Sequence, residues 1–164
     1  MKTKLQAFTL LEVLTVLAIL SILITLSIPS IISFLHHQQD VTRQHQLKTM
    51  LEIAHQAASI NTVAVCRSTN NKTCEGQGNY WLVFFDEKDD GVLVDKSKLI
   101  SVHYIDISDG WLILRSFPRY RQYLRFSGGD IVQADNATIS YYKQKKLMWS
   151  LVVNQAGRVR IAKA

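Results

Sequence analysis

The sequence has only one apolar run long enough to cross a membrane, and it has no internal repeat or low-complexity linker. These absences disfavour a polytopic transporter, a multi-domain enzyme and a disordered chain. Common catalytic motifs are also missing, since no G-x-S-x-G, P-loop, GxGxxG or pair of catalytic carboxylates occurs. We therefore expect a non-enzymatic protein that needs no cofactor.

The single long apolar run lies near the N-terminus, where residues 13–35 contain no charged side chain. As a helix this run would be about 35 Å long, which matches the roughly 30 Å hydrocarbon core of a bilayer. A cleaved secretory signal has a shorter apolar core of about 7 to 15 residues. The run therefore predicts a membrane helix, with Lys2 and Lys4 on the cytoplasmic side.

A carboxylate stands at the edge of this run, where Glu12 follows Phe-Thr-Leu-Leu at residues 8–11. A carboxylate deeper in a membrane costs about 2.5 to 3.5 kcal/mol, so Glu12 needs a partner. With residues 4–7, this arrangement resembles the type IV prepilin signal. The resemblance implies that a prepilin peptidase cleaves between Ala7 and Phe8, that the new Phe8 amine is methylated, and that Glu12 pairs with the N-terminal amine of a neighbouring pilin subunit. Ala7 stands where the family usually has glycine.

The resemblance divides the chain into a leader at residues 1–7, an inner-membrane and filament-core half of a helix at 8–35, and a head at 36–164. It implies that the head lies in the periplasm before assembly and that the assembled protein is in a type IV pilus on the cell surface. Residues 36–60 continue the helix, because apolar side chains recur at helical spacing. These side chains are Leu47, Met50, Leu51, Ala54 and Ala58.

After residue 61 the pattern changes to short strands separated by turn signals. Strands are predicted at residues 80–85, 99–107, 111–117, 120–126, 137–142, 147–153 and 158–162. We expect an α+β, type IV pilin-like fold, in which a long N-terminal helix packs on an antiparallel, sandwich-like β-sheet.

Cysteine is scarce, since Cys66 and Cys74 are the only two and both follow the predicted helix in a polar segment. Two cysteines in an exported head indicate a disulfide, with two free thiols as the alternative. The bond would stabilise the head by about 2 to 3 kcal/mol in the chain-entropy estimate. No second cysteine pair or suitably spaced histidine pair lies nearby, so we expect no zinc site.

An acidic run at residues 86–91 follows a strand that contains Trp81. Lys88 and Ser97 stand where an EF-hand needs oxygen ligands, so we interpret the run as an acidic β-turn rather than a calcium site. The strand and its turn resemble the GspH/FimT group of minor pilins and pseudopilins. The helical histidines are not paired at i, i+4 and predict a solvated helix face rather than a metal site. These are His36, His37, His45 and His55.

Acidic residues are nearly absent from the C-terminal third: residues 111–164 carry ten Lys or Arg and two Asp or Glu, whereas residues 86–110 carry three and seven. A positive surface with interleaved aromatic residues suits a polyanion, above all nucleic acid. Gly157 can adopt a positive φ at a turn, after which Arg158 and Arg160 share one face of a strand. Their spacing of about 6.5 to 7 Å matches successive phosphates. The alternative is a charged outer face on an edge strand.

Residues 157–160 read Gly-Arg-Val-Arg and resemble the GRxR motif of FimT-type minor pilins, which bind DNA during natural transformation. The resemblance implies sequence-independent binding of the DNA phosphate backbone. The expected DNA-binding residues are Gly157, Arg158, Arg160, Lys143, Lys145, Lys146 and Lys163. The alternatives are a GspH-like minor pseudopilin of a type II secretion system, a structural minor pilin that primes pilus assembly, and an adhesin-like pilin that displays the cysteine loop.

Overall fold

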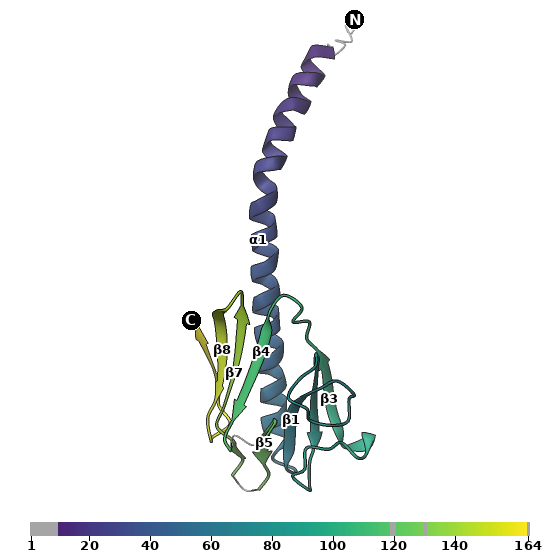
Figure 1. Cartoon of the computed structure of the whole chain (residues 1–164), viewed down its shortest axis with the longest axis vertical. Helices are drawn as coiled ribbons and strands as arrows, with labels where there is room; N and C mark the ends of the chain where they lie inside the picture. The colour runs from purple at the N-terminus through teal and green to yellow at the C-terminus, as the bar shows by residue number, and fades with distance from the viewer. Residues whose placement is uncertain (1–9, 119–120, 130, 164) are drawn as a thin grey trace, which may run out of the picture. The chain divides into compact units, whose positions relative to one another are not determined.

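A computed structural model describes residues 10–118, 121–129 and 131–163 of the chain, with no account of the Lys163 side chain. The predicted leader at residues 1–7, Ala7 and Phe8 lie outside the described residues. Figure 1 shows helix α1 (Leu10–Ala57) followed by an antiparallel β-rich region, so the predicted α+β, type IV pilin-like fold is confirmed. The remaining elements are β1 (Val63–Ser68), β2 (Tyr80–Phe85), the 3-10 helix η1 (Lys96–Lys98), β3 (Leu99–Tyr104), β4 (Trp111–Ser116), β5 (Tyr123–Ser127), β6 (Gln133–Ala134), β7 (Ala137–Lys143), β8 (Lys146–Val153) and β9 (Val159–Lys163).

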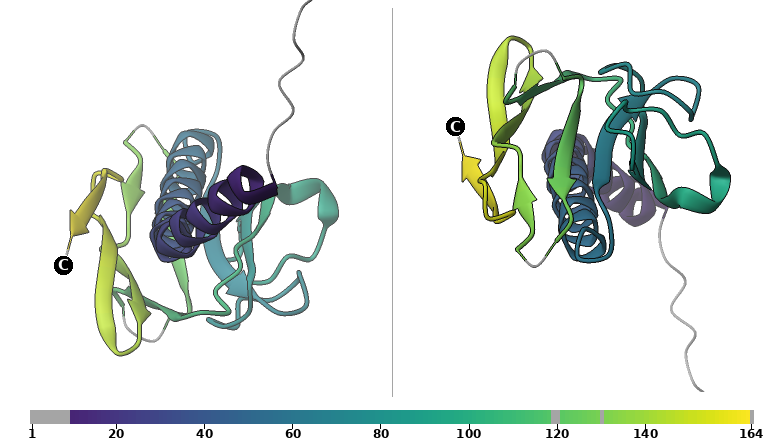
Figure 2. Two further views of the ribbon diagram at one scale, coloured as in Figure 1. Left: turned by 90° about the horizontal axis from the view of Figure 1, so that it is seen from above. Right: turned by 90° about the horizontal axis from the view of Figure 1, so that it is seen from below.

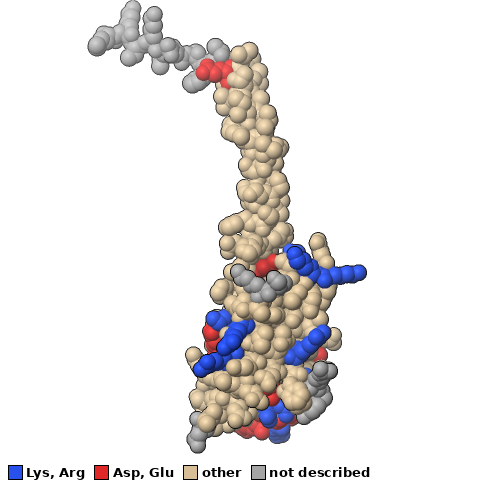
Figure 3. Space-filling model, turned by 90° about the vertical axis from the view of Figure 1, so that its left-hand side faces the viewer, with Lys and Arg blue, Asp and Glu red and all other residues tan. Residues whose placement is uncertain are grey.

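The chain divides into two compact units, and the described part of the first, Met1–Thr42, is the apolar half of α1. Residues 10–39 are all exposed, and Glu12 lies in the first described turn. Hydroxyl groups of this segment donate to carbonyls three or four residues earlier, as Ser21 does to Ala18 at 2.7 Å. The helix therefore satisfies its own polar groups, and its surface between Glu12 and Asp40 carries no charged side chain (Figure 3). It is long and apolar enough to cross a membrane.

The second unit, Arg43–Ala164, contains two antiparallel sheets with strand orders β3-β2-β1-β5-β6 and β4-β7-β8-β9. In Figure 2 the second half of α1 lies between the yellow-green strands of one sheet and the blue to teal strands of the other. Every apolar position predicted for this half of the helix is fully buried. These are Leu47, Met50, Leu51, Ala54 and Ala58, which share one core with side chains of both sheets.

Strand β1 is the central strand of the five-stranded sheet and was not predicted. All six of its residues are buried, so it shows no alternation of apolar and polar side chains. Val63 and Val65 belong to the core that contains the helix, whereas Ala64 and Cys66 pack in a second apolar cluster on the other face of the sheet. The expectation that Cys66 lies in a polar segment is therefore wrong.

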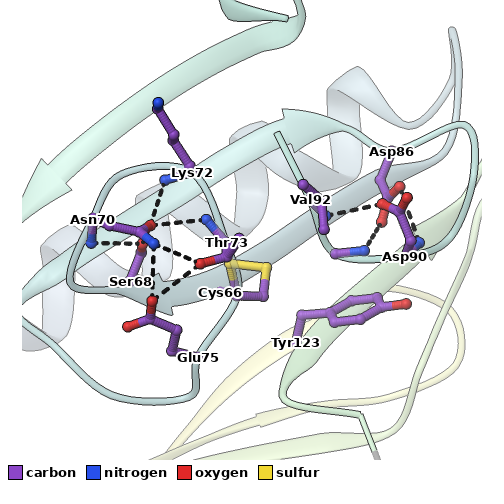
Figure 4. The surroundings of a disulfide bond; sticks show 12 residues. Cys66, Ser68, Asn70, Lys72, Thr73, Glu75, Asp86, Asp90, Val92 and Tyr123 are labelled. Atoms are coloured by element: carbon purple, nitrogen blue, oxygen red, sulfur yellow. Dashed lines mark hydrogen bonds between the residues drawn. A yellow bond between two sulfur atoms is a disulfide. The ribbon is translucent and has the colours of Figure 1, made fainter. Parts of the chain in front are cut away.

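The predicted disulfide between Cys66 and Cys74 is present. Within the loop that it closes, the Asn70 side-chain oxygen accepts hydrogen bonds from the Lys72 and Thr73 amides at 2.8 and 3.0 Å (Figure 4). The Cys74 amide donates to Gly91, which joins this loop to the segment after β2. The loop is thus an ordered part of the cover over the outer face of the five-stranded sheet.

We expect that replacing both cysteines by serine lowers the free energy of unfolding by about 2 to 3 kcal/mol, because the unfolded chain regains the entropy of the open loop. Urea unfolding of the full-length protein in nonionic detergent measures this change. Dithiothreitol should lower the stability of the wild-type protein by a similar amount and leave the double-serine variant unaffected. Equal stability of variant and wild type would contradict the prediction.

Candidate nucleic-acid interface

The turn between β8 and β9 is closed by three hydrogen bonds around Asn154. The Gly157 amide donates to the Asn154 carbonyl at 2.9 Å, and the Arg158 amide donates to the Asn154 side-chain oxygen at 2.9 Å. The Asn154 amide donates in turn to the Arg158 carbonyl. Gly157 has a φ of +70°, the positive value that the sequence predicts for it. The turn therefore fixes where β9 begins and places Arg158 immediately before that strand.

Gly157 is also required by close packing against α1, which the sequence does not reveal. A Cβ atom at this position would lie 1.9 Å from Cδ2 of His55. The His55 ring is half-buried and makes an edge contact with Phe126, with 6.0 Å between ring centroids. The prediction that His55 lies on a solvated helix face is therefore wrong. The absence of a side chain at Gly157 lets the basic hairpin, formed by β8, β9 and the turn between them, approach helix α1.

Arg158 and Arg160 are exposed at the edge of the four-stranded sheet. Arg160 pairs with the exposed Val152, while Val159 pairs with the buried Val153 and packs against the core. Residues that pair directly across two strands share a face, so Arg160 points away from the core. No carboxylate among the described residues makes an ion pair with either arginine. Both charges therefore remain available to an anion.

The predicted lysines differ in their surroundings. Lys145 and Lys146 are exposed where β7 turns into β8, and Lys145 has a φ of +65°. Lys143 is partly buried, and its Nζ lies 2.7 Å from Oδ2 of Asp109. The side chain of Lys163 is outside the described residues, although its backbone pairs with Trp149. Lys143 therefore has a carboxylate partner within its own chain, whereas Lys145 and Lys146 form no ion pair with any described residue.

Asp109 joins the helix to the four-stranded sheet through charged and hydrogen-bonded groups. Its Oδ1 lies 2.8 Å from Nη1 of Arg43 and accepts a hydrogen bond from the Tyr141 hydroxyl at 2.9 Å. Partial burial by itself raises the pKa of Asp109, but the hydrogen bonds from Lys143 and Tyr141 and the charge of Arg43 outweigh it and lower the pKa to about 2. The carboxylate therefore stays ionised and keeps Lys143 in place.

A second carboxylate, Asp89, neutralises cations of strand β5 and the segment before it. Its Oδ2 lies 2.6 Å from Arg121 and 2.9 Å from Arg125, and the Tyr123 hydroxyl donates to its backbone oxygen at 2.8 Å. Burial of the Tyr123 phenol, together with the neighbouring charge of Asp89, raises its pKa. Asp135 gives Arg121 a further ion pair at 3.2 Å. The acidic run is thus a turn, and the charge of its Asp89 forms ion pairs with cations of the head.

The acidic segment therefore neutralises part of the basic C-terminal third. Figure 3 shows Lys and Arg in separate groups with uncharged surface between them on the side that carries β8 and β9. Of the described cations of residues 111–164, five are exposed and have no ion pair. They are Arg115, Lys145, Lys146, Arg158 and Arg160. Arg115 was not among the predicted site residues, because its sequence position gives no indication of its neighbours across the sheet.

No cluster of three or more His, Cys, Asp or Glu side chains that could hold a metal ion occurs in the described part of the chain. The candidate interface therefore consists of the exposed guanidinium and ammonium groups of the five residues named above. Such groups bind phosphate oxygens by charge and hydrogen bonding.

Residues 3–28 match the family model described as the prokaryotic N-terminal methylation motif. No curated protein and no solved structure matches the chain. The motif and the α+β architecture together support a pilin or pseudopilin, a structural class of protein anchored by its N-terminal helix. The motif further implies processing by a prepilin peptidase and assembly with other pilin subunits.

We expect Gly157→Ala to lower the free energy of unfolding by about 1 to 3 kcal/mol, since the new Cβ meets His55 and the positive φ disfavours a side chain. In a His55→Ala background the same substitution should cost less, because only the backbone strain remains. Urea unfolding of the four proteins of this cycle measures the coupling. Equal costs in both backgrounds would show that His55 does not set the requirement for glycine.

We expect Asp109→Asn to lower stability at neutral pH by about 1 to 2 kcal/mol after allowance for solvent screening. The lowered pKa of Asp109 stabilises the fold above about pH 4, and this contribution is lost as the pH falls toward about 2. Urea unfolding across this range should show a weaker acid dependence in the variant. Asp106→Asn is the matched control and should change little, because this carboxylate is exposed and makes no ion pair with a described residue.

Proposed function

We propose that this protein is a minor type IV pilin of the GspH/FimT group that binds DNA for uptake during natural transformation. The observation that carries the proposal is the pair Arg158 and Arg160, which are exposed just before and on the edge strand β9 and free of carboxylate partners among the described residues. Lys145 and Lys146 add exposed positive charge at the turn between β7 and β8.

Binding is electrostatic and largely independent of base sequence. Guanidinium groups hydrogen-bond to phosphate oxygens in a fixed planar geometry, so Arg158 and Arg160 provide the main phosphate contacts. Lys163 is included in the proposed set, whereas Lys143 contributes mainly to the fold through Asp109. Neutralising about three or four phosphates predicts a slope of log K against log salt near −3. One head then binds weakly, and several pilins along one DNA molecule raise the avidity.

The membrane-proximal part of the chain supplies assembly. We infer that the peptidase cleaves between Ala7 and Phe8, that the Phe8 amine is methylated, and that Glu12 pairs with the amine of a neighbouring subunit. Residues 8–35 hold the protein in the inner membrane before assembly, with the head at 36–164 in the periplasm. The assembled protein is then part of a pilus at the cell surface, where its head meets DNA.

A structural role is the second candidate, as a minor pseudopilin or as a minor pilin that primes assembly. The edge position of β9 favours it, because charged residues on an edge strand prevent unwanted pairing with other strands. In this role Arg158 and Arg160 face solvent or another pilin, and the protein has no measurable affinity for DNA.

We expect Arg158→Gln with Arg160→Gln to weaken binding of a short duplex about tenfold or more and to reduce the magnitude of the salt slope by about 1.8. Fluorescence anisotropy with the full-length protein in nonionic detergent measures both quantities. Lys96→Gln is the matched control, because Lys96 is exposed in η1, next to β3 of the five-stranded sheet. Lys143→Gln should change affinity much less than the arginine pair, because Asp109 already neutralises that lysine.

Unchanged duplex affinity in the arginine double variant would refute the role of the hairpin. Loss of secretion or of pilus assembly in the same variant, with DNA binding intact, would favour the structural role instead.

A further inference from the structure

The solvent-facing side of the four-stranded sheet carries a row of residues that crosses all four strands. Arg115 of β4 pairs with Thr138 of β7, Thr138 pairs with Val152 of β8, and Val152 pairs with Arg160 of β9. Because direct partners share a face, all four side chains lie on the outer side of the sheet. Three strand spacings separate the two arginines by about 14 Å between Cα atoms.

A groove of about 760 Å³ lies over the first three residues of this row, where β4 and β8 end and β7 begins. Arg115, Thr138 and Val152 line it, and none of its described lining residues is Asp or Glu. Arg115 is exposed and makes no ion pair with a described residue, so the groove and the adjoining Arg160 have a net positive character. The groove therefore extends from Arg115 on β4 to Val152 on β8, and Arg160 lies one strand beyond it on the same face of the sheet.

The groove also offers an aromatic ring and uncharged polar groups. Phe117 lines it and keeps 68% of its surface exposed, so its ring is accessible to a ligand in the groove. Asn136 is exposed beside it and can donate and accept hydrogen bonds. A positive groove with an exposed ring has the two features that proteins use to hold unpaired nucleotides, since bases stack on the ring while cations contact phosphates.

We propose that this groove binds single-stranded DNA, with an unpaired base stacked on Phe117 and phosphates held by Arg115 and Arg160. The proposal rests on the proposed DNA-binding function and extends it from the hairpin across the whole sheet. Bases of a duplex are stacked on one another and cannot cover Phe117, so duplex DNA engages the arginines alone. Single strands therefore gain a contact that duplexes lack.

The experiment uses the full-length protein in nonionic detergent and fluorescence anisotropy with three probes. They are an oligothymidine of about 12 nucleotides, an abasic oligomer with the same backbone, and a duplex of equal length. This length falls within the range of roughly 4 to 16 nucleotides that single-strand-binding folds cover. Wild type should bind oligothymidine more tightly than the abasic oligomer. Phe117→Leu should weaken oligothymidine binding roughly tenfold and leave both other probes unchanged, whereas Phe117→Tyr should retain the stacking contact.

Arg115→Gln should reduce the magnitude of the salt slope for oligothymidine by about 0.7, the contribution of one phosphate on a single strand. Lys96→Gln, which removes an exposed charge outside the groove, should leave it unchanged. Thermal unfolding of each variant confirms that the exposed substitutions leave the fold intact.

The two proposals fail in different ways. If the Arg158 and Arg160 double variant loses duplex binding while Phe117→Leu and Arg115→Gln bind all probes like wild type, the groove is not a DNA site and the hairpin proposal stands. If the groove variants lose oligothymidine selectively and the double arginine variant keeps its duplex affinity, the hairpin proposal falls. The groove proposal then still requires the double variant to bind oligothymidine more weakly, because that variant lacks Arg160. A Phe117→Leu variant that fails only in pilus assembly would assign the groove to another pilin subunit and overturn the inference.

Discussion

The structure of the head depends on one apolar face of helix α1. Leu47, Met50, Leu51 and Ala54 are completely buried, and both sheets place core side chains against them. Burying a large aliphatic side chain contributes about 1.5 to 3 kcal/mol, so this face is the main source of cohesion between the two sheets. The remaining contacts between helix and sheets act within this arrangement. Arg43 anchors the four-stranded sheet through Asp109, and Gly157 lets the basic hairpin approach His55.

The distribution of charge in the head follows from where this packing brings acidic and basic segments together. Asp89 and Asp109, from the acidic part of the sequence, accept ion pairs from cations that are distant along the chain. A count of charges therefore overstates the free positive charge of the C-terminal third. Among the described residues of this third, the exposed charges without an ion pair lie at the β9 edge, at the turn between β7 and β8, and at Arg115 on β4. The head therefore presents discrete cationic points rather than a uniform basic surface. Under the proposed function this arrangement favours a flexible strand that can adapt its path between them.

Assembly and recognition reside in different parts of the chain. The methylation motif at residues 3–28 supports membrane anchoring, processing and assembly with other pilins, and it overlaps the apolar half of α1. The proposed DNA contacts use only side chains of the four-stranded sheet and its turns. The disulfide loop covers the outer face of the five-stranded sheet and completes its second apolar cluster, so it has a structural explanation without reference to a ligand.

The amino-acid sequence by itself determined the long N-terminal helix, its buried face and most strands, because these depend on local spacing of apolar residues. It also predicted the disulfide and the positive φ of Gly157. It did not predict β1, because a strand buried on both faces lacks alternation, and it placed Cys66 and His55 in surroundings that are too polar. Only the tertiary structure decided which cations are neutralised and that Arg115 and Arg160 share a row. Strand order and register bring together residues far apart in the chain, and no local pattern encodes that pairing.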